Sequence, residues 1–153
     1  MPRGNKYDLE PERSSCVFCK IAAGGVAASI VYETAELLAF LDSYPLFPGH
    51  VLLCPREHCT TLLDIPKGLS EPLMETTRLL AEAVESAVDA EGTFIAINNR
   101  VSQTVPHLHI HIVPRRQRDG LRGFFWPRQH YKDEAAREAV RDAIEREVQK
   151  LLA

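Results

Sequence analysis

Residues 107–113 read His-Leu-His-Ile-His-Ile-Val, and this run decides how the rest of the sequence is interpreted. On an extended strand, successive side chains point to opposite faces of the sheet. The three histidines therefore share one face, while Leu108, Ile110 and Ile112 share the other and can pack on a core. Three imidazoles on one face serve no packing purpose. We predict a strand over 105–113 with a chemical site along its histidine face.

Two kinds of chemistry fit that face. The ordinary pKa of histidine is about 6.5, so imidazole supplies both a nucleophile and a proton donor near neutral pH. Alternate histidines on a strand are also good zinc ligands. A third interpretation is that the three side chains have no chemical role and are either exposed to solvent or hydrogen-bonded within the core.

Composition narrows the class of protein. The chain has 153 residues, a net charge of −3 and 45% hydrophobic residues, which predicts one soluble domain able to form a core without disulfides. It contains no apolar run near the ~18 residues of a membrane span, and residues 1–15 lack the apolar core of a secretory signal. We therefore expect a cytoplasmic protein whose four cysteines are thiols or metal ligands. Mild acidity argues against a protein that coats DNA.

Positive charge is concentrated in one segment. Residues 115–128 contain five arginines and one aspartate, a local charge of +4, so the remainder of the chain carries −7. Such an island suits an anionic ligand of limited size, such as a nucleotide phosphate. A solvated basic loop is the competing interpretation.

The pattern of apolar residues, glycines and prolines predicts alternating short elements. We expect a mobile tail at 1–15, and then one domain at 16–153. Helices are predicted at 17–23, from Ser70 to Gly92, and from Asp133 onward. Strands are predicted at 29–32, 50–54, 94–98 and 105–113, the last closed by Pro114, while 36–41 is ambiguous between helix and strand.

Both long helices carry apolar stripes that we expect to be buried. In the first, Ser70 can serve as the cap, and Gly92 marks the end. Its stripe consists of Leu73, Thr77, Leu80, Val84 and Val88. The stripe of the C-terminal helix consists of Val140, Ile144, Val148 and Leu151.

Together these motifs resemble the histidine triad (HIT) family, in its zinc-containing bacterial type. The triplet followed by two apolar residues is similar to the signature of the family. Further similarity lies in Cys16-x-x-Cys19-Lys-Ile, Phe40-Leu-Asp42, Pro48-Gly-His50, Pro55-Arg-Glu-His58 and Gln103-Thr-Val105. The likeness covers about 16–150. It implies an α+β fold with an antiparallel sheet of about five strands, a long helix and a C-terminal helix, and a homodimer.

The resemblance also implies site roles. His109 would attack the α-phosphate of a nucleotide and form a nucleotidyl-histidine intermediate that water resolves. His111 would contact the phosphate or the bridge to the leaving group, and Asp42 would hold the ribose hydroxyls. The implied substrate-binding residues are Asp42, Asn98, Ser102, Gln103, Thr104, Val105 and His111.

Two segments depart from the family pattern. The stretch 98–103 lacks glycine, which makes close approach of its backbone to a phosphate harder, and Arg100 is a candidate to supply charge there instead. The stretch Gly123-Phe-Phe-Trp-Pro127 is similar to one bacterial branch. It would reach a partner subunit, cover the leaving group, or simply pack its aromatic side chains.

The Cys-x-x-Cys motif fits either zinc or redox chemistry, and the absence of a thioredoxin-like strand before it disfavours redox catalysis. The resemblance implies a closed structural zinc site formed by Cys16, Cys19, His58 and His107. Cys59 is a possible substitute ligand.

The sequence therefore predicts an enzyme that releases a nucleoside monophosphate, preferably with adenosine, from a conjugate. Diadenosine polyphosphates, nucleoside phosphoramidates and adenylated adducts share that part. The segment Val113-Pro114-Arg115 resembles the branch of the family that hydrolyses dinucleoside polyphosphates, and this resemblance slightly favours the first. The alternatives are a nucleotide-binding sensor or interaction module with little turnover, and a zinc-stabilised scaffold. Neither duplex nucleic acid nor a membrane is an expected partner.

Overall fold

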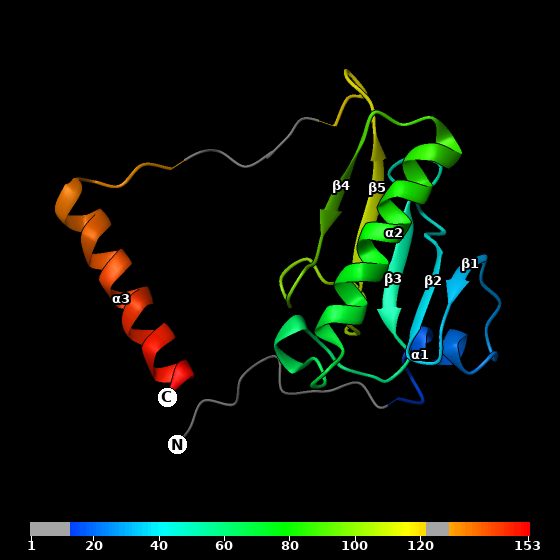
Figure 1. The fold of residues 1–153 in the computed structure, drawn as a ribbon, viewed down its shortest axis with the longest axis horizontal. Helices are drawn as coiled ribbons and strands as arrows, with labels where there is room; N and C mark the ends of the chain where they lie inside the picture. Colours follow the sequence, from blue (N-terminus) through cyan, green and yellow to red (C-terminus); the bar gives the residue numbers. More distant parts are fainter. Residues whose placement is uncertain (1–12, 122–128) are drawn as a thin grey trace. The chain divides into compact units, whose positions relative to one another are not determined.

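The computed structural model describes residues 13–121 and 129–153. The chain divides into two units, Met1–Asp119 and Gly120–Ala153, and each is described by itself. The first unit contains an antiparallel five-stranded sheet with strand order β1-β2-β3-β5-β4 (Figure 1). Its elements are α1 (Val17–Ala22), β1 (Ile30–Glu33), β2 (Leu37–Leu41), β3 (Val51–Pro55), a 3-10 turn (Leu62–Asp64), α2 (Ser70–Val88), β4 (Gly92–Ala96) and β5 (Ile110–Arg115). The predicted α+β architecture is confirmed.

Strand alternation gives the sheet two different faces. One face packs against α2, which crosses β3 and β5 in Figure 1. The core on this face contains odd-numbered residues of β2 and β3 and even-numbered residues of β5: Leu37, Ala39, Val51, Leu53, Ile110 and Ile112. They pack against Leu73, Leu80 and Val84 of α2. The opposite face packs against α1. Its core consists of Cys16, Phe18, Leu38, Phe40, Leu52 and Cys54.

The histidine run lies on the α1 face, as its alternation requires. Leu52 of β3 pairs with His111, so these two side chains share that face. The apolar residues of the run, Leu108, Ile110 and Ile112, are fully buried on the α2 side. The regular strand begins only at Ile110, however, because His107 and His109 precede the ladder. Pro114 does not close the strand, since it pairs with Thr93.

The boundaries of α2 differ from the sequence prediction at both ends. Leu69, not Ser70, is the N-cap, without a side-chain capping bond. The helix ends at Val88 before Gly92, because Asp89 adopts the left-handed conformation that terminates helices. The guanidinium of Arg116 then donates to the carbonyl oxygens of Val88 and Asp89. These bonds satisfy carbonyls that the last helical turn leaves without partners.

The ambiguous segment 36–41 is a strand. Leu37–Leu41 pairs with β1 on one side and β3 on the other, and four of its five residues are buried. Tertiary pairing thus overrides the helical preference of leucine and alanine.

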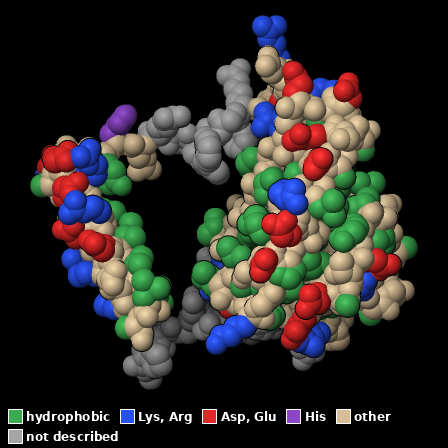
Figure 2. All heavy atoms as spheres, in the orientation of Figure 1, with side chains coloured by type: hydrophobic (Ala, Val, Ile, Leu, Met, Phe, Trp, Pro, Cys, Tyr) green, Lys and Arg blue, Asp and Glu red, His purple; other side chains and the backbone are tan. Residues whose placement is uncertain are grey.

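The second unit contains α3 (Glu134–Leu152), which begins at the Asp133 cap as predicted. Figure 2 shows hydrophobic side chains along one side of this helix and charged side chains beside them. Within this unit taken by itself, the stripe of Val140, Ile144, Val148 and Leu151 lies along one side of the helix, and its burial stays a prediction. Periodicity shows which side of a helix is apolar. The segment 123–127 lies outside the described residues.

Candidate functional site

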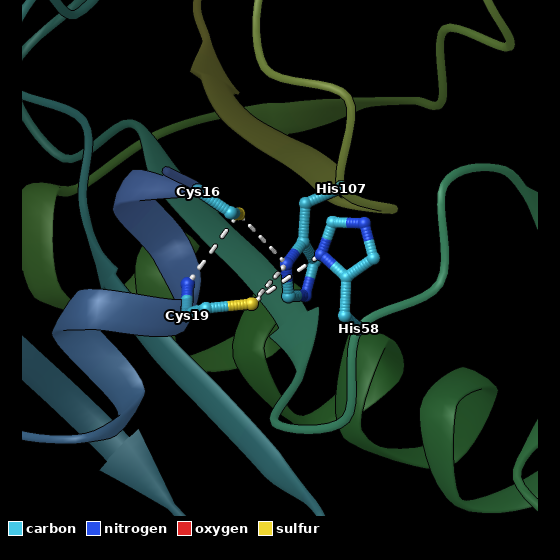
Figure 3. Close-up of side chains that lie close together, drawn as sticks. All are labelled: Cys16, Cys19, His58 and His107. Carbon is cyan, nitrogen blue, oxygen red and sulfur yellow. Dashed lines mark hydrogen bonds between the residues drawn. The ribbon is translucent and has the colours of Figure 1, made fainter. Parts of the chain in front are cut away.

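Four side chains from three separate segments converge beside β3. Cys16 caps α1, Cys19 lies within it, His58 follows β3, and His107 precedes β5. Figure 3 shows the two sulfur atoms facing the two imidazoles. Cys16 Sγ lies 3.3 Å from His107 Nδ1, and Cys19 Sγ lies 3.3 Å from His58 Nδ1 and 3.6 Å from His107 Nδ1. We call these four residues the Cys-His cluster.

The geometry of the Cys-His cluster fits a tetrahedral zinc ion. Zinc bonds sulfur at about 2.3 Å and nitrogen at about 2.0 Å, which at tetrahedral angles places sulfur and nitrogen about 3.5 Å apart. The observed sulfur–nitrogen distances of 3.3–3.6 Å match that spacing. His107 donates from Nε2 to the carbonyl oxygen of Pro55 at 2.7 Å, which leaves the Nδ1 lone pair directed at the sulfurs. Such a bond from the remote ring nitrogen to a backbone carbonyl is typical of metal-bound histidine.

Without a cation, the cluster favours the uncharged forms of its residues. Burial raises the pKa of Cys19 to about 11, with a further contribution from Cys16, and burial lowers the pKa of His107 to about 4. A divalent ion would hold both sulfurs as thiolates and accept the lone pair of neutral His107. The donor set therefore suits a metal that favours thiolate and imidazole ligands.

The hydrogen bonding of His109 leaves one of its ring nitrogens with a lone pair. Its Nδ1 donates to the backbone carbonyl oxygen of His107 at 2.6 Å, so the neutral ring keeps its lone pair on Nε2. Burial lowers the pKa of this imidazole, although the bond to His107 opposes the shift. The ring of Phe18 packs edge-on against it, with centroids 5.1 Å apart and planes at 88°. A neutral imidazole held in one tautomer can attack an electrophile through Nε2.

His111 is held in the opposite role, as a donor. The Leu46 amide donates to His50 Nδ1 at 3.1 Å, so neutral His50 carries its proton on Nε2. That Nε2 lies 3.0 Å from His111 Nδ1 and donates to it. His111 consequently carries its own proton on Nε2, where it can donate to a ligand. Burial lowers the pKa of His111 to about 4, so the ring is neutral at physiological pH.

Asp42, His50 and His111 are close enough to one another to hold a metal ion, but the two nitrogens of His50 point to different neighbours. His50 directs Nδ1 towards Asp42 Oδ2, 3.7 Å away, and Nε2 towards His111. One imidazole cannot present both nitrogens to the same ion. We therefore interpret His50 and His111 as an orienting pair, with Asp42 beside it. The Tyr44 amide donates to Asp42 Oδ1 at 2.9 Å.

A pocket of about 570 Å³ lies between α1, the end of β2 and the loop before His107, and the histidines are not among the residues that line it. Val17, Phe18 and Ile21 of α1 form one apolar wall, and Phe18 also contacts His109. Among the predicted substrate-binding residues, those that line this pocket are Asp42, Thr104 and Val105. The pocket thus combines an apolar wall with a carboxylate and a hydroxyl, and Phe18 connects it to His109.

The other predicted substrate-binding residues lie in or beside the loop before His107. Asn98 follows β4 two residues after Ala96, which pairs with His111. Gln103 has a structural role: its Nε2 donates to the Thr60 carbonyl at 2.6 Å, and its Oε1 accepts from the Arg100 amide at 2.8 Å. Ser102 is exposed and has a φ of 61°.

The absence of glycine from this loop does not prevent a glycine-like backbone. Arg100 and Ser102 both have positive φ values, 69° and 61°, in the region where side chains are strained. The sequence shows that glycine is missing from this loop, but it does not show that the loop adopts a glycine-like conformation.

Part of the basic segment is engaged inside the protein. Arg115 donates to both carboxylate oxygens of Asp119, at 2.6 and 3.0 Å, and Arg116 caps α2 as described above. Arg122 and Arg128 lie outside the described residues. The charge count alone therefore overstated how many arginines are available to an anion.

Sequence reasoning missed two contributions to the site. His50 was named only as part of a stretch similar to the family, without a role in the site, yet it determines which nitrogen of His111 carries the proton. The apolar residues of α1 were recognised as a short helix, but not as a wall of the pocket. The period-2 pattern could not reveal either feature, because both depend on contacts across segments.

Comparison with known proteins matches this geometry to one family. The HIT domain matches residues 24–118, which is more than half of the chain. This chain belongs to the HIT family. The predicted family membership is thereby confirmed, and solved structures confirm the HIT-like fold.

Curated relatives include two named enzymes. The chain is 34% identical over 118 residues to adenylylsulfatase HINT3 of Arabidopsis thaliana, covering 76% of this chain and 60% of that protein. It is 31% identical over 120 residues to adenosine 5'-monophosphoramidase HNT1 of Candida albicans, covering 74% of this chain and 79% of that protein. Family membership and these names together support hydrolase activity on nucleotide substrates in general.

Two solved structures extend the comparison. The chain resembles SMU.412c from Streptococcus mutans with a TM-score of 0.81 and 32% identity, over 97% of this chain and 99% of that one. It resembles a Zn-bound histidine triad family protein from Mycobacterium smegmatis with a TM-score of 0.67 and 33% identity, over 90% of this chain and 98% of that one.

Among the described residues, no helix combines the length and hydrophobicity that crossing a membrane requires.

Proposed function

We propose that this protein transfers or hydrolyses the nucleotidyl group of a nucleotide conjugate through an intermediate on His109. The observation that carries the proposal is the bond from His109 Nδ1 to the His107 carbonyl, which leaves Nε2 as the nucleophilic nitrogen. The names of the relatives from Arabidopsis thaliana and Candida albicans support the same reaction class.

The first step forms a bond between His109 Nε2 and the α-phosphorus. The bond from phosphorus to the leaving group breaks, and the leaving group takes the bonding electron pair. His109 gains positive charge in this step, and the His107 carbonyl oxygen stabilises that charge through the short bond to Nδ1. Water then attacks phosphorus and restores His109. The net reaction adds one water, with its hydroxyl on phosphorus and a proton on the leaving group.

His111 stabilises the phosphoryl oxygens during both steps. Its Nε2–H is available as a donor because His50 occupies its Nδ1. Donors that are already oriented towards developing negative charge lower the barrier without reorganising. In the same proposal, the Thr104 hydroxyl and backbone N–H groups of the loop 102–105 supply further donors.

The pocket accounts for the nucleoside. Asp42 Oδ2 accepts from the ribose hydroxyls, while its Oδ1 is held by the Tyr44 amide. The apolar wall of α1 contacts the base, and we expect adenine to be preferred. Among leaving groups, sulfate and an amine fit the activities named for the relatives. Diadenosine polyphosphates remain candidates, although two nearby arginines are engaged within the chain.

We further propose that the Cys-His cluster holds a structural zinc ion and that the protein is a homodimer. The ion would tie α1 and the segment of His58 to His107. The spacing of the ligand atoms and the Zn-bound relative support the first part. The family resemblance supports the second.

The test measures AMP release from adenosine phosphoramidate, adenylyl sulfate and diadenosine tetraphosphate. We expect release by the wild type and a loss of at least about 1000-fold in His109→Ala, since this change removes the nucleophile. His130→Ala is the matched control, because His130 is exposed and lies in the second unit. The ratios of the three rates rank the leaving groups.

The contrary results are equally specific. AMP release by His109→Ala at the wild-type rate would refute the covalent mechanism. Tight AMP binding without release from any of the three substrates would support a nucleotide sensor instead.

A further inference from the structure

The Cys-His cluster is attached directly to the wall of the pocket. Helix α1 has only six residues, fewer than an isolated helix needs to be stable in water. Cys16 and Cys19 anchor its first turn in the cluster, and Arg56 Nη1 donates to the Ala22 carbonyl at its end. The position of this helix therefore depends on what holds its two cysteines.

Phe18 connects that helix to the nucleophile. It lies between the two cysteines in sequence, its exposed fraction is 5%, and its ring packs edge-on against His109. It also contacts the rings of His107, at 5.8 Å between centroids, and Phe40, at 5.2 Å. If the two cysteines shifted, Phe18 would move against the nucleophile and against the pocket that it lines.

A second connection runs through His107. Its imidazole belongs to the Cys-His cluster, while its backbone carbonyl accepts the bond that orients His109. One residue thus links the cluster to the tautomer of the nucleophile. Two independent paths, through Phe18 and through His107, lead from the cluster to the same imidazole.

We propose that the Cys16–Cys19 pair is a redox switch that turns nucleotide binding off when it is oxidised. The inference rests on the proposed function, because it regulates the same pocket. Cys19 is partly exposed and its sulfur is the accessible one of the pair, since Cys16 is buried. Both belong to one Cys-x-x-Cys segment and have ligand atoms within 4.8 Å of each other. Closing the pair removes both sulfur ligands at once.

The oxidant is a hydroperoxide. The Cys19 thiolate attacks one peroxide oxygen, the O–O bond breaks, and a sulfenic acid forms with release of water after protonation. The Cys16 thiolate then attacks the Cys19 sulfur and displaces the second oxygen as water. Two thiolates, one hydrogen peroxide and two protons give one disulfide and two waters, and the bound ion leaves. The two cysteines lose two electrons, which the peroxide gains.

The experiment uses the full chain, reduced and loaded with zinc, and titrates it with hydrogen peroxide. Three quantities are followed: zinc released to a chromophoric chelator, the Cys16–Cys19 disulfide by peptide mass spectrometry, and the Kd of AMP by calorimetry. We expect zinc release and disulfide formation to rise together, and the Kd of AMP to increase at least about tenfold. Dithiothreitol with zinc should restore the original Kd.

Two variants sharpen the test. Cys54→Ala should respond like the wild type, because Cys54 lies outside the Cys-His cluster and its side chain is fully buried from any oxidant in solution. Cys19→Ser cannot form the disulfide, so peroxide should not change its affinity for AMP. Hydrogen exchange in the oxidised protein should show lost protection in α1 and retained protection in α2.

The outcomes separate the two proposals. If the reduced, zinc-loaded protein does not bind AMP, the proposed function fails. If AMP binds and oxidation releases zinc without changing the Kd, the switch is refuted. Zinc retention after complete oxidant treatment, or loss of protection throughout the sheet and α2, also refutes the switch, because the proposed change is local and reversible.

Discussion

Replacing Ser102 by glycine should stabilise the protein, because Ser102 has a φ of 61°. A residue with a Cβ atom in the left-handed region costs about 1–2 kcal/mol. Glycine removes that cost but loses about 0.5–1 kcal/mol through its greater freedom in the unfolded chain. The expected gain in unfolding free energy is therefore about 0.5–1 kcal/mol, which raises Tm by about 2–3 °C in a chain of this length.

Val101 provides the matched control. It lies between Arg100 and Ser102, its exposed fraction is 72%, and its φ is not positive. Val101→Gly therefore suffers the entropic cost of glycine without relieving strain, and should destabilise by about 0.5–1 kcal/mol. The two variants should differ by about 1–2 kcal/mol with opposite signs relative to the wild type.

Urea unfolding followed by circular dichroism measures this difference. The slope m should stay constant, so that the shift in midpoint reports stability alone. If Ser102→Gly destabilises the protein as much as Val101→Gly, the left-handed conformation is not strained in this loop. The glycine-free segment would then be an ordinary loop.

Three further results are expected. His50→Phe should lower kcat at least about tenfold with a smaller change in KM, since His111 loses the partner that fixes its tautomer. His50→Gln keeps a hydrogen-bond donor and should retain more activity. An equal loss of activity in both variants would contradict this role of His50. The pKa of His111 is about 4 in the folded protein and about 6.5 in the unfolded chain. As the pH falls, the unfolded chain therefore binds this proton first. The free energy of unfolding should decrease as the pH falls from about 6.5 towards about 4. Denaturation of His111→Gln should show a shallower decrease over that range, whereas an identical slope would exclude this contribution. Removing metal with a chelator should lower Tm by at least about 5 °C, and an unchanged Tm together with a zinc content under about one-tenth equivalent would exclude a structural zinc ion.

The sequence predicted those features of the site that follow from local alternation. The histidines share one face because side chains alternate along an extended chain, and this holds for His107 and His109 even though they precede the regular strand. The same rule placed Leu108 and Ile110 in the core. The four Cys-His residues were selected by family resemblance, and the structure brings them together.

What the sequence could not predict depends on contacts between distant segments. His50 and His111 are 61 residues apart, and only the pairing of β3 with β5 brings them within bonding distance. The segment 36–41 is too short for its periodicity to distinguish a strand from a helix. The α3 helix begins at its predicted cap, and the burial of its apolar stripe stays a prediction.

Burial keeps the pKa values of His50, His109 and His111 below the ordinary value for histidine, so these rings are uncharged at physiological pH. A zinc ion with two thiolates is formally neutral as well. A phosphate in this pocket would therefore be held by dipoles and N–H groups, with no fixed cation among these rings. The Kd of AMP should then rise less than about threefold between about 50 and about 500 mM salt, whereas a tenfold rise would contradict a neutral site. Such a site would release its charged product readily, because no ion pair has to break first.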